Sequence, residues 1–80
     1  MKVELTTPAV QDLARLPAKD AAQILKKIQR LEGGLVGDIK ALKHAEFGYR
    51  LRSGDWKVLF DLEKVGVVIR RIKNRRDAYE

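Results

Sequence analysis

The chain has 80 residues and is expected to form one domain over 1–80, which excludes a multi-domain enzyme. With 45% hydrophobic and 35% charged residues it is not a disordered tail, and with no cysteine and one histidine, His44, it can form neither a thiolate zinc site nor a histidine metal cluster. Lysine and arginine number 17 against 11 acidic residues, and this net charge of +6 indicates an acidic or polyanionic partner.

The first part of the chain predicts a strand followed by two helices. Residues 2–6 alternate polar and apolar side chains, the period of a half-buried strand. Thr7 before Pro8 indicates a helix start, because the hydroxyl can cap free amides and proline costs no hydrogen bond there. After Pro17, a second helix that ends at 33–34 carries apolar residues at helical spacing, namely Ala21, Ile24, Leu25, Ile28 and Leu31. Two helices this close should form a hairpin.

The second part predicts a loop and a three-stranded meander. Residues 34–48 lack periodicity and are interpreted as an ordered loop with a short anchor at 39–42. Three strands are expected at 47–52, 56–62 and 67–72, with a turn at 53–55. The last strand reads as buried on both faces. The element order β-α-α-β-β-β predicts an α+β fold, with an antiparallel sheet and a two-helix hairpin packed on one face.

Alternation along these strands predicts where the charge gathers. The helices should cover the face that carries Tyr49, Leu51, Trp56, Val58 and Phe60. Arg50, Arg52 and Lys57 then stand on the opposite face. A basic run should pass close to them because it leaves the sheet on an adjacent strand, and it consists of Arg70, Arg71, Lys73, Arg75 and Arg76. Such a cationic site suits a phosphate backbone, whereas an ordinary solvated surface is the simpler alternative.

Three segments, taken together, resemble a known family. They are the early A-x-x-D-L-x-x-L-P pattern at 9–17, YRLRSGDWKVLF at 49–60 and IKNRRDAYE at 72–80. With the element order, they resemble the RelE/ParE superfamily of bacterial type II toxins over almost the whole chain. The resemblance implies a RelE-like fold and a toxin that a cognate antitoxin neutralises, in a higher-order toxin–antitoxin complex. RelE-like members cut mRNA in the A site of the 70S ribosome, whereas ParE-like members inhibit DNA gyrase.

The resemblance also implies a metal-independent reaction, with no cofactor, in which the ribose 2′-hydroxyl attacks the adjacent phosphate. Arg50, Lys57, Arg75 and Tyr79 match active-site positions of the family and are the expected catalytic residues. Arg50 and Arg75 would stabilise the phosphate, since a guanidinium is a permanent two-pronged donor. Tyr79 would stack on or orient the nucleotide. The residues expected to bind RNA are Arg52, Arg70, Arg71, Lys73 and Arg76.

The sequence does not decide which residue is the general base. Arginine does not give up its proton, so Arg50 and Arg52 are poor bases. Lys57 could act if the neighbouring cations favoured its neutral form, and His44 is the other candidate by chemistry although it lies outside the motifs. Asn74 stands where many relatives have a histidine, which removes one possible acid.

Three functions follow, in order of preference. The first is a ribosome-dependent mRNA endonuclease, the second a ParE-like gyrase inhibitor that acts through the helix hairpin, and the third a non-catalytic RNA-binding or regulatory module. In each case an acidic and apolar antitoxin segment could cover Arg75 or displace the residues around 76–79. No apolar run approaches the roughly 20 residues that a membrane span needs, and the amino terminus lacks a signal-peptide core, so we expect a cytoplasmic protein.

Overall fold

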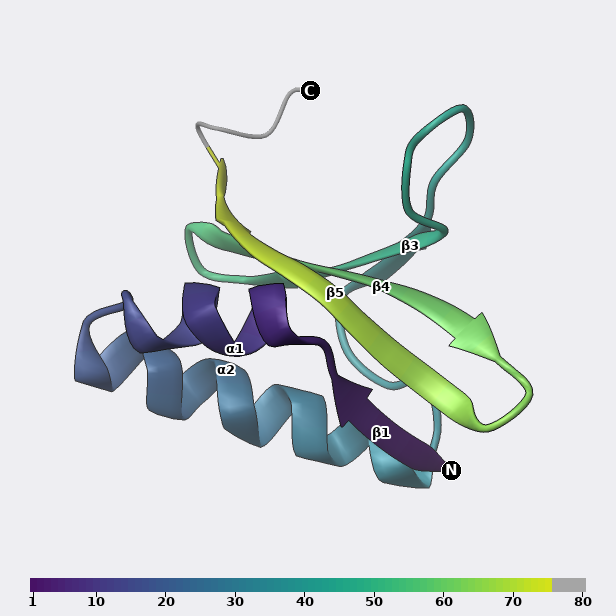
Figure 1. Cartoon of the computed structure of the whole chain (residues 1–80), viewed down its shortest axis with the longest axis horizontal. Helices are drawn as coiled ribbons and strands as arrows, with labels where there is room; N and C mark the ends of the chain where they lie inside the picture. The colour runs from purple at the N-terminus through teal and green to yellow at the C-terminus, as the bar shows by residue number, and fades with distance from the viewer. Residues whose placement is uncertain (76–80) are drawn as a thin grey trace.

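The computed structural model describes residues 1–75, and two helices and five strands lie within that range. In chain order they are β1 Lys2–Leu5, α1 Thr7–Ala14, α2 Ala18–Arg30, the short 3₁₀ turn η1 Leu31–Gly33, β2 Ile39–Ala41, β3 Tyr49–Ser53, β4 Trp56–Glu63 and β5 Gly66–Asn74. The strands form one sheet in the order β1-β5-β4-β3-β2, and both helices lie on the same side of it (Figure 1). The predicted α+β fold, with a helix hairpin on one face, is confirmed.

One part of the predicted topology is wrong, because the sheet is mixed and not wholly antiparallel. β1 pairs in parallel with β5, with Val3 opposite Val67, while the other neighbouring strands are antiparallel. The helix hairpin carries the chain from β1 at one edge of the sheet to β2 at the other, and the meander then returns to place β5 beside β1. The pairing places β5 between two strands, and its apolar run at 67–69 is buried, as predicted for a strand covered on both faces.

A second difference lies in the segment predicted as a loop anchor. Ile39–Ala41 forms β2, an edge strand that pairs antiparallel with β3. Lys40 lies directly opposite Arg50 in this register. Three residues are too few to show a period of two, so the sequence pattern could not distinguish this strand from a loop. β2 extends the sheet by one strand on the side of the predicted cationic site.

The start of α1 is set one residue earlier than predicted. Thr6, not Thr7, is the cap, and its hydroxyl oxygen accepts a hydrogen bond from the Ala9 amide at 3.3 Å. The same hydroxyl lies 3.0 Å from the carbonyl oxygens of Ile69 and Arg70, to which it can donate. Thr6 therefore joins the end of β1, the start of α1 and the middle of β5, which fixes the helix hairpin against the sheet.

The core lies between the helices and the covered face of the sheet. Leu51, Val58 and Phe60 on β3 and β4 are fully buried, and Ile24 and Ile28 of α2 pack in the same cluster. Each such side chain contributes about 1.5–3 kcal/mol on burial. At one end of the sheet the Trp56 indole donates to the Asp20 carboxylate at 3.1 Å, which holds the start of α2. Since one face is used for the core, alternate residues of the same strands must face outward.

The close approach of β1 to β5 depends on a glycine and generates the first prediction. Gly66 has a φ of +135°, and a Cβ atom there would lie 2.1 Å from the Lys2 carbonyl oxygen. We expect Gly66→Ala to lower the free energy of unfolding by at least about 2 kcal/mol, measured by urea denaturation. Gly33→Ala is the matched control, because nothing lies within 4 Å of its Cβ position. Equal losses in the two variants would contradict this account of the β1–β5 pairing.

Candidate functional site

The outward face of the sheet carries a row of cations across three strands. Arg52 on β3 lies opposite Lys57 on β4, and Lys57 lies opposite Lys73 on β5. Residues that lie opposite each other on neighbouring strands project to the same face of the sheet. The next pair along, Leu51 and Val58, is buried against the helices. The row therefore stands on the side of the sheet away from the helices, which we call the open face. The structure thus places Arg50, Arg52 and Lys57 on the face opposite the helices, as the alternation along the strands predicted.

Arg75 joins three of the strand cations at one end of the open face. Arg50, Arg52, Lys57 and Arg75, which we call the cationic cluster, line one small pocket of about 50 Å³. The Arg75 amide donates to the Asp55 carbonyl oxygen at 2.6 Å, which holds this residue beside the turn between β3 and β4. The structure thus brings together side chains from three segments, as the alternation predicted. Their chemical roles stay predictions.

Arg50 has an unsatisfied hydrogen-bond donor in this pocket. Its side chain is 21% exposed, and its Nη2 atom lies 3.5 Å from an oxygen of the more exposed Asp38 carboxylate. Its Nε atom is buried and has no hydrogen-bond partner among the residues that the structure describes. A buried donor without an acceptor costs about 1–3 kcal/mol. The partly exposed guanidinium of Arg50 lines the pocket together with Arg52, Lys57 and Arg75, so the pocket favours an anionic acceptor such as a phosphate.

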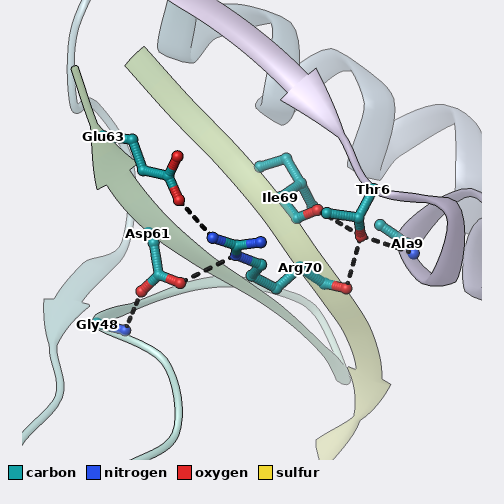
Figure 2. A network of polar contacts seen from close by, with 7 residues as sticks. All are labelled: Thr6, Ala9, Gly48, Asp61, Glu63, Ile69 and Arg70. Atoms are coloured by element: carbon teal, nitrogen blue, oxygen red, sulfur yellow. Dashed lines mark hydrogen bonds and ion pairs between the residues drawn. The ribbon is translucent and has the colours of Figure 1, made fainter. Parts of the chain in front are cut away.

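Arg70, one of the predicted RNA-binding residues, is engaged by acidic side chains (Figure 2). Its Nε donates to Asp61 at 3.1 Å, and its Nη2 pairs with Glu63. The second Asp61 oxygen accepts the Gly48 amide at 2.7 Å, so the network also anchors the segment between β2 and β3. A bulge between Leu59 and Phe60 leaves Arg70 without a partner residue on β4. A role of Arg70 in RNA binding stays a prediction, and it would compete with these two ion pairs.

Arg71 is also paired, and its partner is a buried acid. Asp12 of α1 is 8% exposed and accepts two hydrogen bonds from the Arg71 guanidinium, at 2.7 and 3.2 Å, and a third from the Ile72 amide at 2.9 Å. β1 pairs with β5 only as far as Ile69, so Asp12 satisfies an amide that no strand partner reaches. Burial alone would raise the pKa of Asp12, but these hydrogen bonds and the Arg71 charge hold it below its ordinary value. The Asp12 hydrogen bond in turn raises the pKa of Arg71.

Two residues near the site were not predicted from the sequence. Asp12 interrupts the apolar stripe of α1, and such a polar residue could have signalled a buried contact. Lys40 lies opposite Arg50 on the open face, but only the unpredicted strand β2 places it there. The predicted residues Arg76 and Tyr79 lie outside the described range of 1–75.

His44, the other candidate base, lies in the segment between β2 and β3, with a φ of 57°, and does not line the pocket of the cationic cluster. In residues 1–75, no three His, Cys, Asp or Glu side chains gather as a metal-ligand set. None of the helices in that range has the length and apolar character needed to cross a membrane.

The fold is similar to that of three solved toxin–antitoxin complexes. The RelB–RelE antitoxin–toxin complex from Methanococcus jannaschii matches with a TM-score of 0.76 and 24% identity over 90% of this chain and 89% of that chain. The RelE–RelB complex from Pyrococcus horikoshii OT3 matches with a TM-score of 0.78 and 25% identity, over 96% of this chain and 97% of that chain. The toxin–antitoxin complex RelBE2 from Mycobacterium tuberculosis matches with a TM-score of 0.76 and 27% identity, over 91% of this chain and 95% of that chain.

The chain is RelE-like. The structural similarity confirms the RelE-like resemblance that the three sequence segments predicted. The similarity extends over nearly the whole length of this chain and of the matched chains. No family model and no curated protein matches the sequence. The RelE-like identification therefore depends on the arrangement of the strands and helices.

The Asp12 contacts generate a prediction on stability and its pH dependence. Asp12→Asn removes the ion pair with Arg71, and we expect it to cost about 1–3 kcal/mol at pH 7. Because the pKa of Asp12 is lowered on folding, the stabilisation is fully present above the unfolded value of about 3.9 and fades as the pH falls through the lower folded value. Denaturant unfolding between pH 7 and pH 2.5 should show the two proteins converging in acid.

The matched control for this change is Glu4→Gln. Glu4 pairs with Lys2 on the surface, where both side chains are at least half exposed, so its loss should cost less than about 0.5 kcal/mol. A constant difference between wild type and Asp12→Asn over the whole pH range would contradict the role assigned to the Asp12 carboxylate.

Proposed function

We propose that the protein is the toxin of a type II toxin–antitoxin system and that it cleaves mRNA in the A site of the ribosome. Two observations support this proposal. The structural neighbours are complexes of RelE with an antitoxin, and their similarity covers at least 90% of this chain. The cationic cluster contains a buried arginine donor, the Arg50 Nε atom, that lacks an acceptor among the described residues. The gathering of four cations at one pocket is the single observation that most favours a phosphate ligand.

The proposed reaction is an internal transfer at the RNA phosphate that needs no metal. The 2′-hydroxyl oxygen forms a bond to phosphorus while the bond from phosphorus to the 5′ oxygen of the next nucleotide breaks. A base takes the proton of the 2′-hydroxyl, and an acid gives a proton to the leaving 5′ oxygen. The products are a cyclic 2′,3′-phosphate, or the 3′-phosphate after hydrolysis, and a free 5′-hydroxyl. Negative charge grows on the phosphorane oxygens in between.

The cationic cluster supplies what that intermediate requires. Arg50 and Arg75 are assigned to the phosphorane oxygens, because preorganised charged donors stabilise charge that develops in the transition state. Lys57 lines the same pocket and lies opposite Arg52, and it is the leading candidate for the base. His44 is the alternative base. Tyr79 is assigned to stacking on the nucleotide.

The ribosome would supply the positioning that so small a protein lacks. The pocket of the cationic cluster is only about 50 Å³, much smaller than the roughly 300–1,000 Å³ of a site that encloses a small ligand. Such a surface can contact a phosphate but cannot fix a flexible RNA strand in line for attack. Holding the reacting groups in place is a large part of catalysis, and mRNA in the ribosomal A site is already held.

The proposed partner is an antitoxin with an acidic segment. The net charge of +6 and the cations of the open face favour a negatively charged chain, and the structural neighbours are solved with RelB antitoxins. An antitoxin that covers Arg75 would block the cationic cluster directly. We further propose that toxin and antitoxin assemble into a higher-order complex.

The test of this function is cleavage of an mRNA on programmed ribosomes, mapped by primer extension beside a ribosome-free control. We expect wild type to cut only with ribosomes. Arg75→Ala and Arg50→Ala should each slow cleavage by about 100- to 1,000-fold, since each removes a donor to the developing charge. Lys64→Ala is the matched control, because Lys64 lies in the turn between β4 and β5 and outside the pocket.

Undiminished cleavage by both arginine variants would contradict the site. No cleavage by wild type, together with inhibition of supercoiling by purified gyrase, would instead assign the protein to the gyrase inhibitors. Binding of RNA without any cleaved product would assign it to the non-catalytic RNA-binding proteins.

A further inference from the structure

A second and larger hollow lies where β5 meets the junction of β1 with α1 and the segment between β2 and β3, and Thr6, Pro8 and Arg70 are among its lining residues. Its volume is about 390 Å³, within the roughly 300–1,000 Å³ of small-ligand sites. Its walls include Glu46 and Phe47 from the segment between β2 and β3 and the β5 residues Arg71 and Lys73. Lys73 is also the cross-strand partner of Lys57, which belongs to the cationic cluster. The cross-strand pair of Lys57 and Lys73 therefore relates the two hollows, since each residue lines one of them.

The segment that carries Glu46 and Phe47 is held at its base. It rises from the sheet on the side away from the helices (Figure 1). The Leu42 amide donates to the Gly48 carbonyl oxygen at 2.8 Å, which closes the segment, and the Gly48 amide donates to Asp61 on β4 at 2.7 Å (Figure 2). Phe47 is half buried. The aromatic ring is thus presented by a closed and anchored loop, next to the cations of β5.

The residues of this hollow differ from those of a plain phosphate site. A phosphate site needs only donors and positive charge, and an acid in it repels the ligand. Glu46 nevertheless lies near Arg71, and after the Asp12 contact it helps to raise the pKa of that guanidinium. A carboxylate only accepts hydrogen bonds, so Glu46 selects a ligand with N–H donors. Together with an aromatic ring and cations, this combination is suited to an unstacked nucleobase attached to a phosphate.

We propose that this hollow is a base-specific subsite that binds one guanine of single-stranded RNA. Phe47 stacks on the base, Glu46 accepts the adjacent N1–H and N2–H donors of the guanine edge, and Lys73 contacts the neighbouring phosphate. Among the four RNA bases only guanine offers two such donors side by side on its Watson–Crick edge. The inference rests on the proposed function in one respect, since it takes RNA as the ligand.

The test measures binding independently of cleavage. Fluorescein-labelled 2′-O-methyl RNA hexamers, which lack the attacking hydroxyl and cannot be cut, carry one guanine or one adenine within a run of uracil. Fluorescence anisotropy with the full chain should give about tenfold tighter binding to the guanine hexamer. The uracil hexamer provides the reference for binding that does not depend on the base.

Three variants separate the parts of the subsite. Glu46→Gln should remove the preference for guanine while it leaves binding of the uracil hexamer undiminished, and Glu32→Gln, the same change in η1 and outside the hollow, should keep the preference. Phe47→Leu should weaken binding of every hexamer by about tenfold, whereas Phe47→Tyr should keep it. Thermal unfolding of each variant checks that the fold is retained.

The outcomes distinguish this inference from the proposed function. Equal binding of the three hexamers by wild type, no measurable binding, or a guanine preference that survives Glu46→Gln would overturn the subsite, even if the protein cleaves mRNA on ribosomes. A guanine preference lost in Glu46→Gln supports the subsite, even if wild type cleaves no mRNA. On programmed ribosomes, the same variant should redistribute the cuts away from codons that contain guanine without abolishing them.

Discussion

The register of β4 against its two neighbours is the constraint on which the site depends. Val58 and Phe60 are fully buried against the helices, so Lys57 must project to the open face. The pairing places Arg52 on one side of Lys57 and Lys73 on the other. A slip of one residue would turn these cations into the core and expose the apolar residues. Because burial of the core fixes the register, the same free energy that folds the protein also holds like charges close together.

The cations of the chain serve two different purposes. Arg70 and Arg71 form ion pairs with acids and join β5 to β4 and to α1. Arg50 has a buried donor without a partner among residues 1–75, and the acid with which it pairs, Asp38, is largely exposed. Arg70 and Arg71 must therefore break an ion pair before they can meet an anion. On the open face, positive charge gathers along the Arg52–Lys57–Lys73 row and in the cationic cluster.

Much of the fold and part of the site follow from patterns with a physical basis. Alternation in β3 and β4 and the helical stripe of α2 are strong periodic signals, and they predicted the covered face and the outward positions of Arg50, Arg52 and Lys57. The parallel pairing of β1 was not predictable in the same way, because nothing in a four-residue alternation specifies its neighbour. β2 was missed because it is three residues long, and Lys40 was missed with it. The pairing of Asp12 with Arg71 joins residues 59 positions apart, a separation that local patterns do not encode.

The central claim is that the open face, and not the helix hairpin, meets RNA. The most direct measurement is a titration of ¹⁵N-labelled protein with an uncleavable 2′-O-methyl RNA hexamer, followed by amide chemical shifts. We predict that the largest changes map to Arg50, Arg52, Lys57 and Lys73 on β3, β4 and β5, while the exposed amides of α1 and α2 stay unchanged. Changes confined to α1 and α2, with the strand amides unaffected, would contradict it.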